Sequence, residues 1–319
     1  MNIKGWASGG LALGMALSAV ACGGEGGGGR QEFLSLGTGG TGGIYYPLGG
    51  AITSLLSVED SLRQYTAEVT GGSVENVNRL REGQIDLGFA LAISIHAAYH
   101  GGQDYGDPFE SLRVLAPLYP NMVHVLVPRG STATSLGDLA GGRISVGAAG
   151  SGTEEVSRQL LGVYGLTYDD VDARFLTFSE SSASLRDEAI DGAIISVGYP
   201  AAAVLEATTT GGARLLSFEP DRIDALRRQY PYYSPGTIPA GAYSGLESDV
   251  TTLAMMNWIV ATEELDPAIV TGLLTILRDQ KASLEQVHEM ATQIELSLLS
   301  DAPIPLHPVT EAWLGGEGE

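Results

Sequence analysis

A glycine-rich stretch near the start of the chain is suited to holding an anion. Residues 37–52 read GTGGTGGIYYPLGGAI, with seven glycines and two adjacent tyrosines. The apolar segment FLSL precedes the stretch, and Leu48, Ile52 and Leu55 follow at helical spacing. Glycine lets backbone N–H groups approach a bound group closely, and a helix N-terminus adds a partial positive charge. The order strand, glycine loop, helix therefore predicts an anion-binding cradle.

A second glycine loop of the same kind lies near the middle of the chain. Residues 143–155 read RISVGAAGSGTEE, with Ser151 or Thr153 as the expected helix N-cap and two glutamates in the first turn. Neither residues 37–50 nor residues 147–155 contain lysine or arginine. A carboxylate held here would bond to backbone N–H groups, to Ser and Thr hydroxyls and to two helix N-termini.

The familiar catalytic loops are missing from both stretches. The first has no acidic residue at the end of a second strand about 20 residues on, as a dinucleotide site needs, and no Gly-Lys-Ser/Thr of a P-loop. The chain also has no Gly-x-Ser-x-Gly elbow. We predict that the protein is not an enzyme. An exported hydrolase that uses Ser151 or Ser179 is the less favoured alternative.

One group of residues has partial metal-ligand spacing. His96, His100 and Asp104 follow each other at intervals of four. The glycines at 101 and 102 break a helix at this point, and a fourth ligand is missing. We therefore predict no metal and no cofactor.

Composition restricts the partners. Of 319 residues, 44% are hydrophobic, enough for a large core, and the formal net charge is −21. An acidic surface argues against nucleic acid and anionic membrane as partners. The ligand would have to be held by local dipoles that overcome the long-range repulsion.

The N-terminus reads as an export signal. Residues 1–22 form a signal peptide with a short apolar run that ends at Ala19-Val20-Ala21-Cys22. Cys22 is the only cysteine and ends a lipobox-like sequence, so we expect a lipid anchor there, with residues 23–32 as a glycine-rich tether. Ordinary secretory cleavage with an unused cysteine is the alternative. Both place the protein in the periplasm or at the cell surface.

The mature chain repeats one plan twice. Residues 78–91 read NRLREGQIDLGFAL and residues 183–196 read ASLRDEAIDGAIIS, each a helix end followed by a strand-length apolar run. We expect these helices to be capped at Ser73 and near Ser179. Strands that alternate with helices predict parallel sheets covered on both faces. The fold class is therefore α/β, with two similar lobes and a ligand cleft between them at the strand ends.

The expected lobes are discontinuous in sequence. Lobe 1 comprises residues 33–118 and about 250–319, lobe 2 about 119–217, and about 218–249 form the return crossing and a connecting segment. Helices over residues 267–277 and 282–299 would complete lobe 1.

Six motifs resemble one family when they are read together. In chain order they are GTGGTGGIYYPLGGAI, TGGSVENVNRLREGQIDLGF, LAPLYPNMVHVLV, VGAAGSGTE, IDGAIISVGYPAAAV and IPAGAYSG. They resemble the TAXI-type solute receptors of tripartite ATP-independent periplasmic (TRAP) transporters. The resemblance implies a two-lobed periplasmic-binding-protein fold of the second type, and delivery of a small organic anion to a membrane permease.

The resemblance also implies the site and the ligand class. The ligand would be an amino acid, a 2-oxo acid or a dicarboxylate. After the strand IDLGF the family often carries a polar Gln or Asp pair, whereas this chain reads ALAIS, which makes a partly hydrophobic ligand an expectation and leaves Ser94 as one polar group. A sensor subunit for a membrane histidine kinase is the alternative function. The expected contacts are Thr38, Gly39, Thr41, Gly42, Gly43, Tyr45, Tyr46, Ser94, Ser151, Gly152, Thr153, Ser179, Ser182 and Tyr199.

Overall fold

The computed structural model describes residues 32–102 and 104–316, which belong to the compact unit Gln31–Glu319. The predicted signal peptide, Cys22 and almost all of the tether lie outside the described residues. Glu32, the last residue of the predicted tether, begins the first strand.

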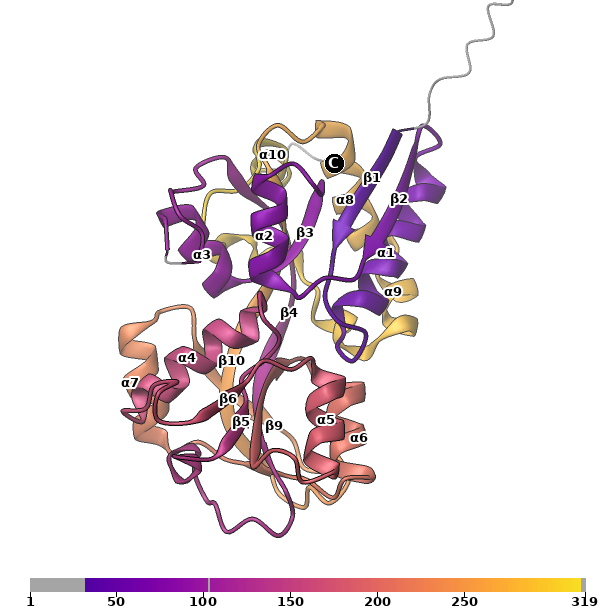
Figure 1. Ribbon diagram of the computed structural model, residues 1–319. Coiled ribbons are helices and arrows are strands. Elements are labelled where there is room, and N and C mark those ends of the chain that lie inside the picture. Colours follow the sequence, from indigo (N-terminus) through magenta and orange to yellow (C-terminus); the bar gives the residue numbers. More distant parts are fainter. Residues whose placement is uncertain (1–31, 103, 317–319) are drawn as a thin grey trace, which may run out of the picture. The chain divides into compact units, whose positions relative to one another are not determined.

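A ten-stranded mixed sheet forms the centre of the unit (Figure 1). β8 (Arg214–Leu216) pairs with β4, and β9 (Ser234–Ile238) pairs with β10. The other strands lie side by side in the order β2 (Arg63–Glu68), β1 (Glu32–Gly37), β3 (Leu87–Leu91), β10 (Val250–Thr262), β4 (Leu112–Val127), β7 (Gly192–Val197), β5 (Arg143–Ser145) and β6 (Asp172–Arg174).

The outer strands on the two sides are parallel, as the sequence predicts. β1 pairs in parallel with β2 and β3, and β5 with β6 and β7. The two long strands β4 and β10 run antiparallel to each other and join the two groups. The expected boundary between the lobes, at residues 118 and 119, lies inside the continuous strand β4.

Helices cover both faces of the sheet. α1 packs on β2 and against α8 and α9, while α2 packs on β3 and against α3 (Figure 1). The helices are α1 (Tyr45–Glu59), α2 (Ser73–Arg81), α3 (Ala92–His100), α4 (Gly152–Val163), α5 (Phe178–Arg186), α6 (Ala202–Thr209), α7 (Pro220–Gln229), α8 (Pro267–Asp279), α9 (Lys281–Val287) and α10 (Pro308–Leu314), with 3₁₀ turns at Leu136–Leu139, Glu289–Gln293 and Leu296–Asp301.

The helix predicted over residues 282–299 is wrong. α9 ends at Val287, and two 3₁₀ turns follow. His288 has an extended backbone, and its Nδ1 accepts a hydrogen bond from the N–H of Met290 at 3.1 Å. This local cap starts a new turn and ends the α-helix.

The core lies on the two faces of the sheet. Leu36, Leu48 and Phe89 are buried on one face with α1, and Val77 and Trp258 are buried on the other with α2. β3 and β7 are buried along their whole length, which confirms the buried parallel strands read from the two repeats.

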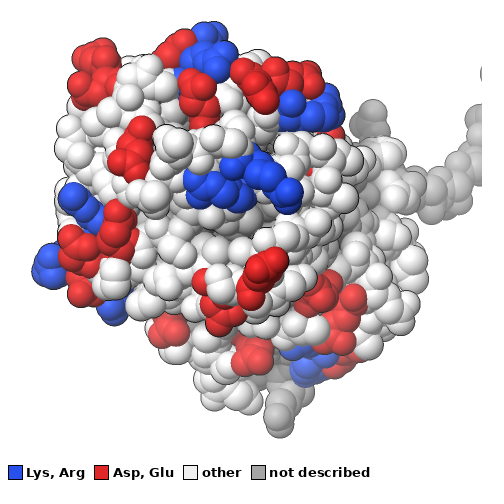
Figure 2. Space-filling view, turned by 90° about the horizontal axis from the view of Figure 1, so that it is seen from below, with Lys and Arg blue, Asp and Glu red and all other residues white. Residues whose placement is uncertain are grey.

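Most charged residues lie on the surface. Figure 2 shows acidic and basic side chains interspersed over one face, with broad uncharged areas between them. Many arginines form exposed ion pairs, such as Arg186 with Asp187 and Arg174 with Asp172. Such pairs contribute little to stability. Within residues 32–102 and 104–316, no helix has both the length and the apolar character needed to cross a membrane.

Candidate functional site

A cavity of about 230 Å³ lies where four helices begin. Its lining includes the first residues of α1, α2, α4 and α5, which are Tyr45, Ser73, Gly152 and Phe178. The N–H groups of a helix's first turn have no intrahelical acceptor, and they carry the positive end of the helix dipole. Four such ends around one cavity make it favourable for an anion.

The cavity lining is uncharged. Among the described residues, those that surround the cavity include no Asp, Glu, Lys, Arg or His. Polar groups come from backbone, Ser, Thr, Asn and Tyr, and apolar walls from Val69, Leu91 and Phe178. The complete lining is Gly39, Gly40, Thr41, Gly42, Gly43, Ile44, Tyr45, Val69, Thr70, Gly71, Gly72, Ser73, Leu91, Tyr119, Asn121, Ala148, Ser151, Gly152, Thr153, Thr177, Phe178, Ser179, Ser196 and Val197.

The structure brings both glycine loops to this one cavity. Nine of the predicted site residues line it. Eight belong to the two loops and the helix starts that follow them, and the ninth, Ser179, belongs to α5. Those that line the cavity are Gly39, Thr41, Gly42, Gly43, Tyr45, Ser151, Gly152, Thr153 and Ser179.

Five other predicted residues lie outside the lining. Thr38 is buried, and its hydroxyl donates to the carbonyl of Glu68 at 2.6 Å. Ser182 donates to the carbonyl of Ala203 at 2.6 Å, and Ser94 donates to the carboxylate of Glu155. Tyr46 is 38% exposed, and Tyr199 is half-buried. The hydroxyl groups of Thr38, Ser94 and Ser182 thus donate to other groups of the protein and not to the cavity.

The helix caps explain which serines face the cavity. Ser151 caps α4 by accepting the N–H of Glu154 at 3.2 Å, as predicted. The caps predicted at Ser73 and near Ser179 are wrong, because Gly72 and Thr177 occupy those positions. Gly72 has φ 119°, which favours glycine, and Thr177 forms a capping box with Glu180. Ser73 and Ser179 are therefore inside their helices and line the cavity.

Some lining residues are not among the predicted contacts. Asn121 lies in β4 and Ser196 in β7, each within one of the six motifs, but neither is singled out there as a contact. Phe178 could have been found from the capping box, because Thr177 and Glu180 show the Thr-x-x-Glu pattern of a helix start.

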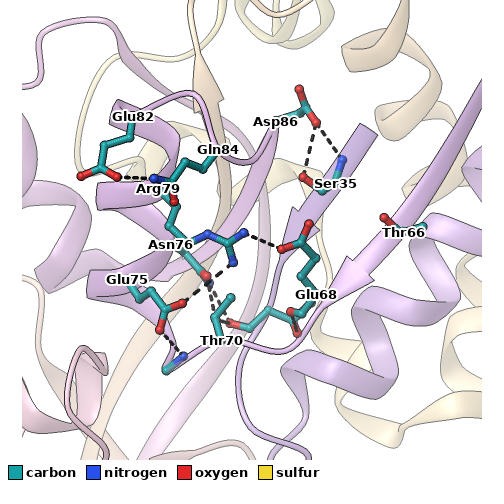
Figure 3. A network of polar contacts seen from close by, with 12 residues as sticks. Ser35, Thr66, Glu68, Thr70, Glu75, Asn76, Arg79, Glu82, Gln84 and Asp86 are labelled. Atoms are coloured by element: carbon teal, nitrogen blue, oxygen red, sulfur yellow. Dashed lines mark hydrogen bonds and ion pairs between the residues drawn. The ribbon is translucent and has the colours of Figure 1, made fainter. Parts of the chain in front are cut away.

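Asn76 joins the loops that carry the cradle. Its Nδ2 donates to the carbonyls of Thr38 at 2.7 Å and Phe89 at 2.9 Å, and its Oδ1 accepts the hydroxyl of Thr70 at 2.7 Å. Figure 3 shows Asn76 beside Thr70, with Arg79 reaching Glu68. These three bonds of Asn76 connect the residue after β1, the strand β3 and the loop before α2, and so hold these segments together.

A second polar chain lies behind the cavity wall. The hydroxyl of Tyr45 donates to Oδ1 of Asn257. Asn257 donates to Oδ1 of Asn121 at 2.7 Å, and Asn121 donates to the carbonyl of Ser196 at 2.9 Å. Burial raises the pKa of Tyr45 well above its usual range, so the phenol stays protonated and remains a donor.

Glu155 is a buried carboxylate next to the cavity. It lies in the first turn of α4, is 6% exposed, and accepts hydrogen bonds from Ser94 of α3 and from Tyr105 at 3.1 Å. Burial raises its pKa to about 7, and the bonds from Ser94 and Tyr105 oppose that rise. Asp104 raises the pKa further, and Arg158 lowers it.

The protein should lose stability between pH 5 and pH 8 because of Glu155. The folded-state pKa of about 7 exceeds the ordinary value of 4.5, so the folded state binds this proton more tightly. The resulting stability is fully present below about pH 4.5 and is lost as pH rises through about 7. We expect Glu155→Gln to reduce the drop from pH 5 to pH 8 by about 2 kcal/mol, measured by urea unfolding.

Glu285, an exposed glutamate in α9, provides the control for this measurement. Glu285→Gln should leave the pH dependence as it is in the native chain. Equal pH dependence in the native chain and in Glu155→Gln would contradict the account of Glu155.

The described residues contain no group of three or more His, Cys, Asp or Glu placed to hold a metal ion. Of the spaced residues noted in the sequence, His96 and His100 lie with their ring centroids 4.5 Å apart and their rings tilted by 54°, while Asp104 pairs with Arg158.

Comparison with known proteins shows the family and the fold. The model of the NMT1-like family matches residues 36–318. A solved protein from Bordetella bronchiseptica RB50 aligns with a TM-score of 0.52 at 16% identity, over 89% of this chain and 81% of that one. The periplasmic aliphatic sulphonate binding protein SsuA from Escherichia coli aligns at 0.44 and 17%, over 90% and 79%. An ancestral arginine-binding protein aligns at 0.49 and 15%, over 81% and 97%.

At such identities the likeness concerns the fold alone. The fold is α/β, as predicted, built here on a mixed sheet, and the Bordetella bronchiseptica protein shares it at a TM-score of 0.52. Since the family model covers most of the chain, the protein belongs to the NMT1-like family.

Proposed function

We propose that the protein is an extracytoplasmic solute receptor, without catalytic activity, that captures a small organic carboxylate in the cavity. It delivers this solute to a TRAP-type membrane permease, as a receptor of the TAXI type. The observation that carries the proposal is the meeting of four helix N-termini around an uncharged cavity.

The energetics of this arrangement suit reversible capture. A helix N-terminus contributes up to about 2 kcal/mol to a partly buried anion. Several N–H and hydroxyl bonds to a charged acceptor, each worth about 1.5–3 kcal/mol, bring micromolar affinity within reach. The cavity of about 230 Å³ is smaller than the roughly 300–1,000 Å³ of drug-sized sites, which favours a small solute. Its walls of Val69, Leu91 and Phe178 favour a solute with an apolar portion.

The transporter type rests on the sequence. The six TAXI-like motifs occur in order across the part of the chain that the NMT1-like model matches. Five of them, including both glycine loops, contribute residues to the cavity lining. In this proposal the signal peptide exports the chain from the cytoplasm, and a lipid on the lipobox-like Cys22 anchors the receptor to the membrane.

The lobes remain as proposed from the sequence, with residues 33–118 and about 250–319 in one and about 119–217 in the other. Because β4 and β10 run from one group of parallel strands to the other, they are the proposed crossings about which the lobes close. The segment of about 218–249, with α7 and β9, leads into β10.

Calorimetric titration of the mature protein with a panel of organic acids tests the function. The panel holds dicarboxylates, 2-oxo acids, amino acids and branched short-chain acids. We expect at least one acid to bind with a dissociation constant of about 10 μM or lower. Native mass spectrometry of protein purified from its own host should show a bound mass that matches such an acid. Failure of every acid, together with an empty mass spectrum, would contradict the proposal.

A further inference from the structure

We infer that the solute is an organic acid without an ammonium group, such as a 2-oxo, 2-hydroxy or plain carboxylic acid, and not an amino acid. The inference rests on the proposed function. It comes from the charge character of the cavity lining, which among the described residues holds four helix N-termini and no carboxylate.

Three hydroxyls in the lining already accept a bond from a backbone N–H. Ser73 accepts from Leu91 at 3.1 Å, Ser151 from Glu154 at 3.2 Å, and Thr153 from Ser196 at 3.4 Å. A hydroxyl has one hydrogen to donate, and that hydrogen is not used in these bonds. The hydroxyls of Ser151 and Thr153 therefore each keep a hydrogen that can be donated to a solute, whereas the hydroxyl of Ser73 is also hydrogen-bonded to the side chain of Tyr45.

Some acceptors around the cavity already take part in one hydrogen bond. Examples are Gly40 O from Gly43 (3.2 Å), Gly42 O from Ala203 (3.3 Å), Ala148 O from Ser151 (3.1 Å), Tyr119 O from Asn257 (2.7 Å), Asn121 Oδ1 from Asn257 (2.7 Å) and Ser196 O from Asn121 (2.9 Å). None of the acceptors on the described lining residues is a carboxylate, which is the group that best matches an ammonium.

The nearest carboxylates are also bonded elsewhere, and none of them lines the cavity. Glu75 accepts the N–H of Gly71 at 2.7 Å, and Glu180 accepts the N–H and hydroxyl of Thr177 at 2.8 Å. In α4, Glu154 bonds to Tyr168 and Arg158, and Glu155 bonds to Ser94 and Tyr105.

An amino acid would suit this lining poorly. Its carboxylate could use the donors, but its ammonium group has three N–H donors and no acceptor of its own. Enclosed in the cavity without a carboxylate partner, the ammonium would lose its water and gain little in return. A site that leaves a buried polar group unpaired discriminates strongly against the ligand that carries it.

Matched pairs of solutes test this inference on the native mature protein. Each pair shares a carbon skeleton: 2-oxoglutarate with L-glutamate, 4-methyl-2-oxopentanoate with L-leucine, and pyruvate with L-alanine. Titration calorimetry measures each dissociation constant in the same buffer. For the skeleton that binds best, we expect the 2-oxo acid to bind at least about 100-fold more tightly than the amino acid.

The outcomes separate the two claims. An amino acid that binds as tightly as its 2-oxo partner, or more tightly, would overturn the inference and leave the receptor function standing. If no member of the pairs or of the wider acid panel binds, the proposed function fails, and this inference fails with it.

Discussion

Replacing Gly42 by valine is expected to lower the affinity for the captured acid by about 100-fold. A Cβ atom at Gly42 would lie 2.6 Å from the hydroxyl oxygen and 3.3 Å from the backbone nitrogen of Ser179. It would also lie 3.4 Å from the Cβ atom of Ala203, whose N–H donates to the carbonyl of Gly42. The first glycine loop would have to move away from α5, which opens the cavity. Calorimetry with the tightest acid of the panel measures the loss.

Gly40 provides the matched control. It lines the same cavity in the same loop, and a Cβ atom there would meet nothing within 4 Å. Gly40→Ala should therefore keep the affinity within about threefold, since an open position carries no overpacking cost. Unchanged affinity in Gly42→Val, or an equal loss in both variants, would mean that contact between the loop and α5 does not shape the site.

Replacing Asn76 by leucine is expected to lower the free energy of unfolding by about 3 kcal/mol or more. The Asn76 side chain is fully buried, and its amide satisfies the carbonyls of Thr38 and Phe89 and the hydroxyl of Thr70. Leucine would remove these three bonds, and each buried group left unsatisfied costs about 1–3 kcal/mol. The Thr70 hydroxyl keeps its bond to the carbonyl of Thr38 at 3.1 Å, so the carbonyl of Phe89 loses most. Urea unfolding at constant pH gives the change.

Asn78, two residues later on α2, is the matched control. Its side chain is half-buried and makes a longer bond, 3.3 Å, to the carbonyl of Asp104. Asn78→Leu should change the free energy of unfolding by less than about 1 kcal/mol. If Asn76→Leu is no more destabilising than Asn78→Leu, the network in Figure 3 does not hold the cradle in place.

The parts of the fold that follow from local pattern could be predicted from the sequence. The two glycine loops, the cap at Ser151 and the buried strands β3 and β7 each depend on residues close together in the chain. The convergence of the loops on one cavity was expected from parallel strands, whose carboxyl ends lie at the same edge of a sheet.

Other parts depend on partners distant in sequence. Ser94 follows β3 and was expected at the cleft, but Glu155, 61 residues away, accepts its hydroxyl. The caps of α2 and α5 differ from the prediction by one or two residues, because Gly72 and Thr177 begin the helices earlier. Asn121 and Ser196 reach the cavity only because β4 and β7 pair in the sheet.

A crystal structure of the mature protein with its solute bound is the most direct measurement of the central claim. The account predicts that the solute carboxylate lies within hydrogen-bond distance of the first-turn N–H groups of α1 and α4 and of the hydroxyl of Ser151, with no arginine or lysine in contact. A solute bound away from this cavity, or a carboxylate held by an arginine or lysine side chain, would contradict it.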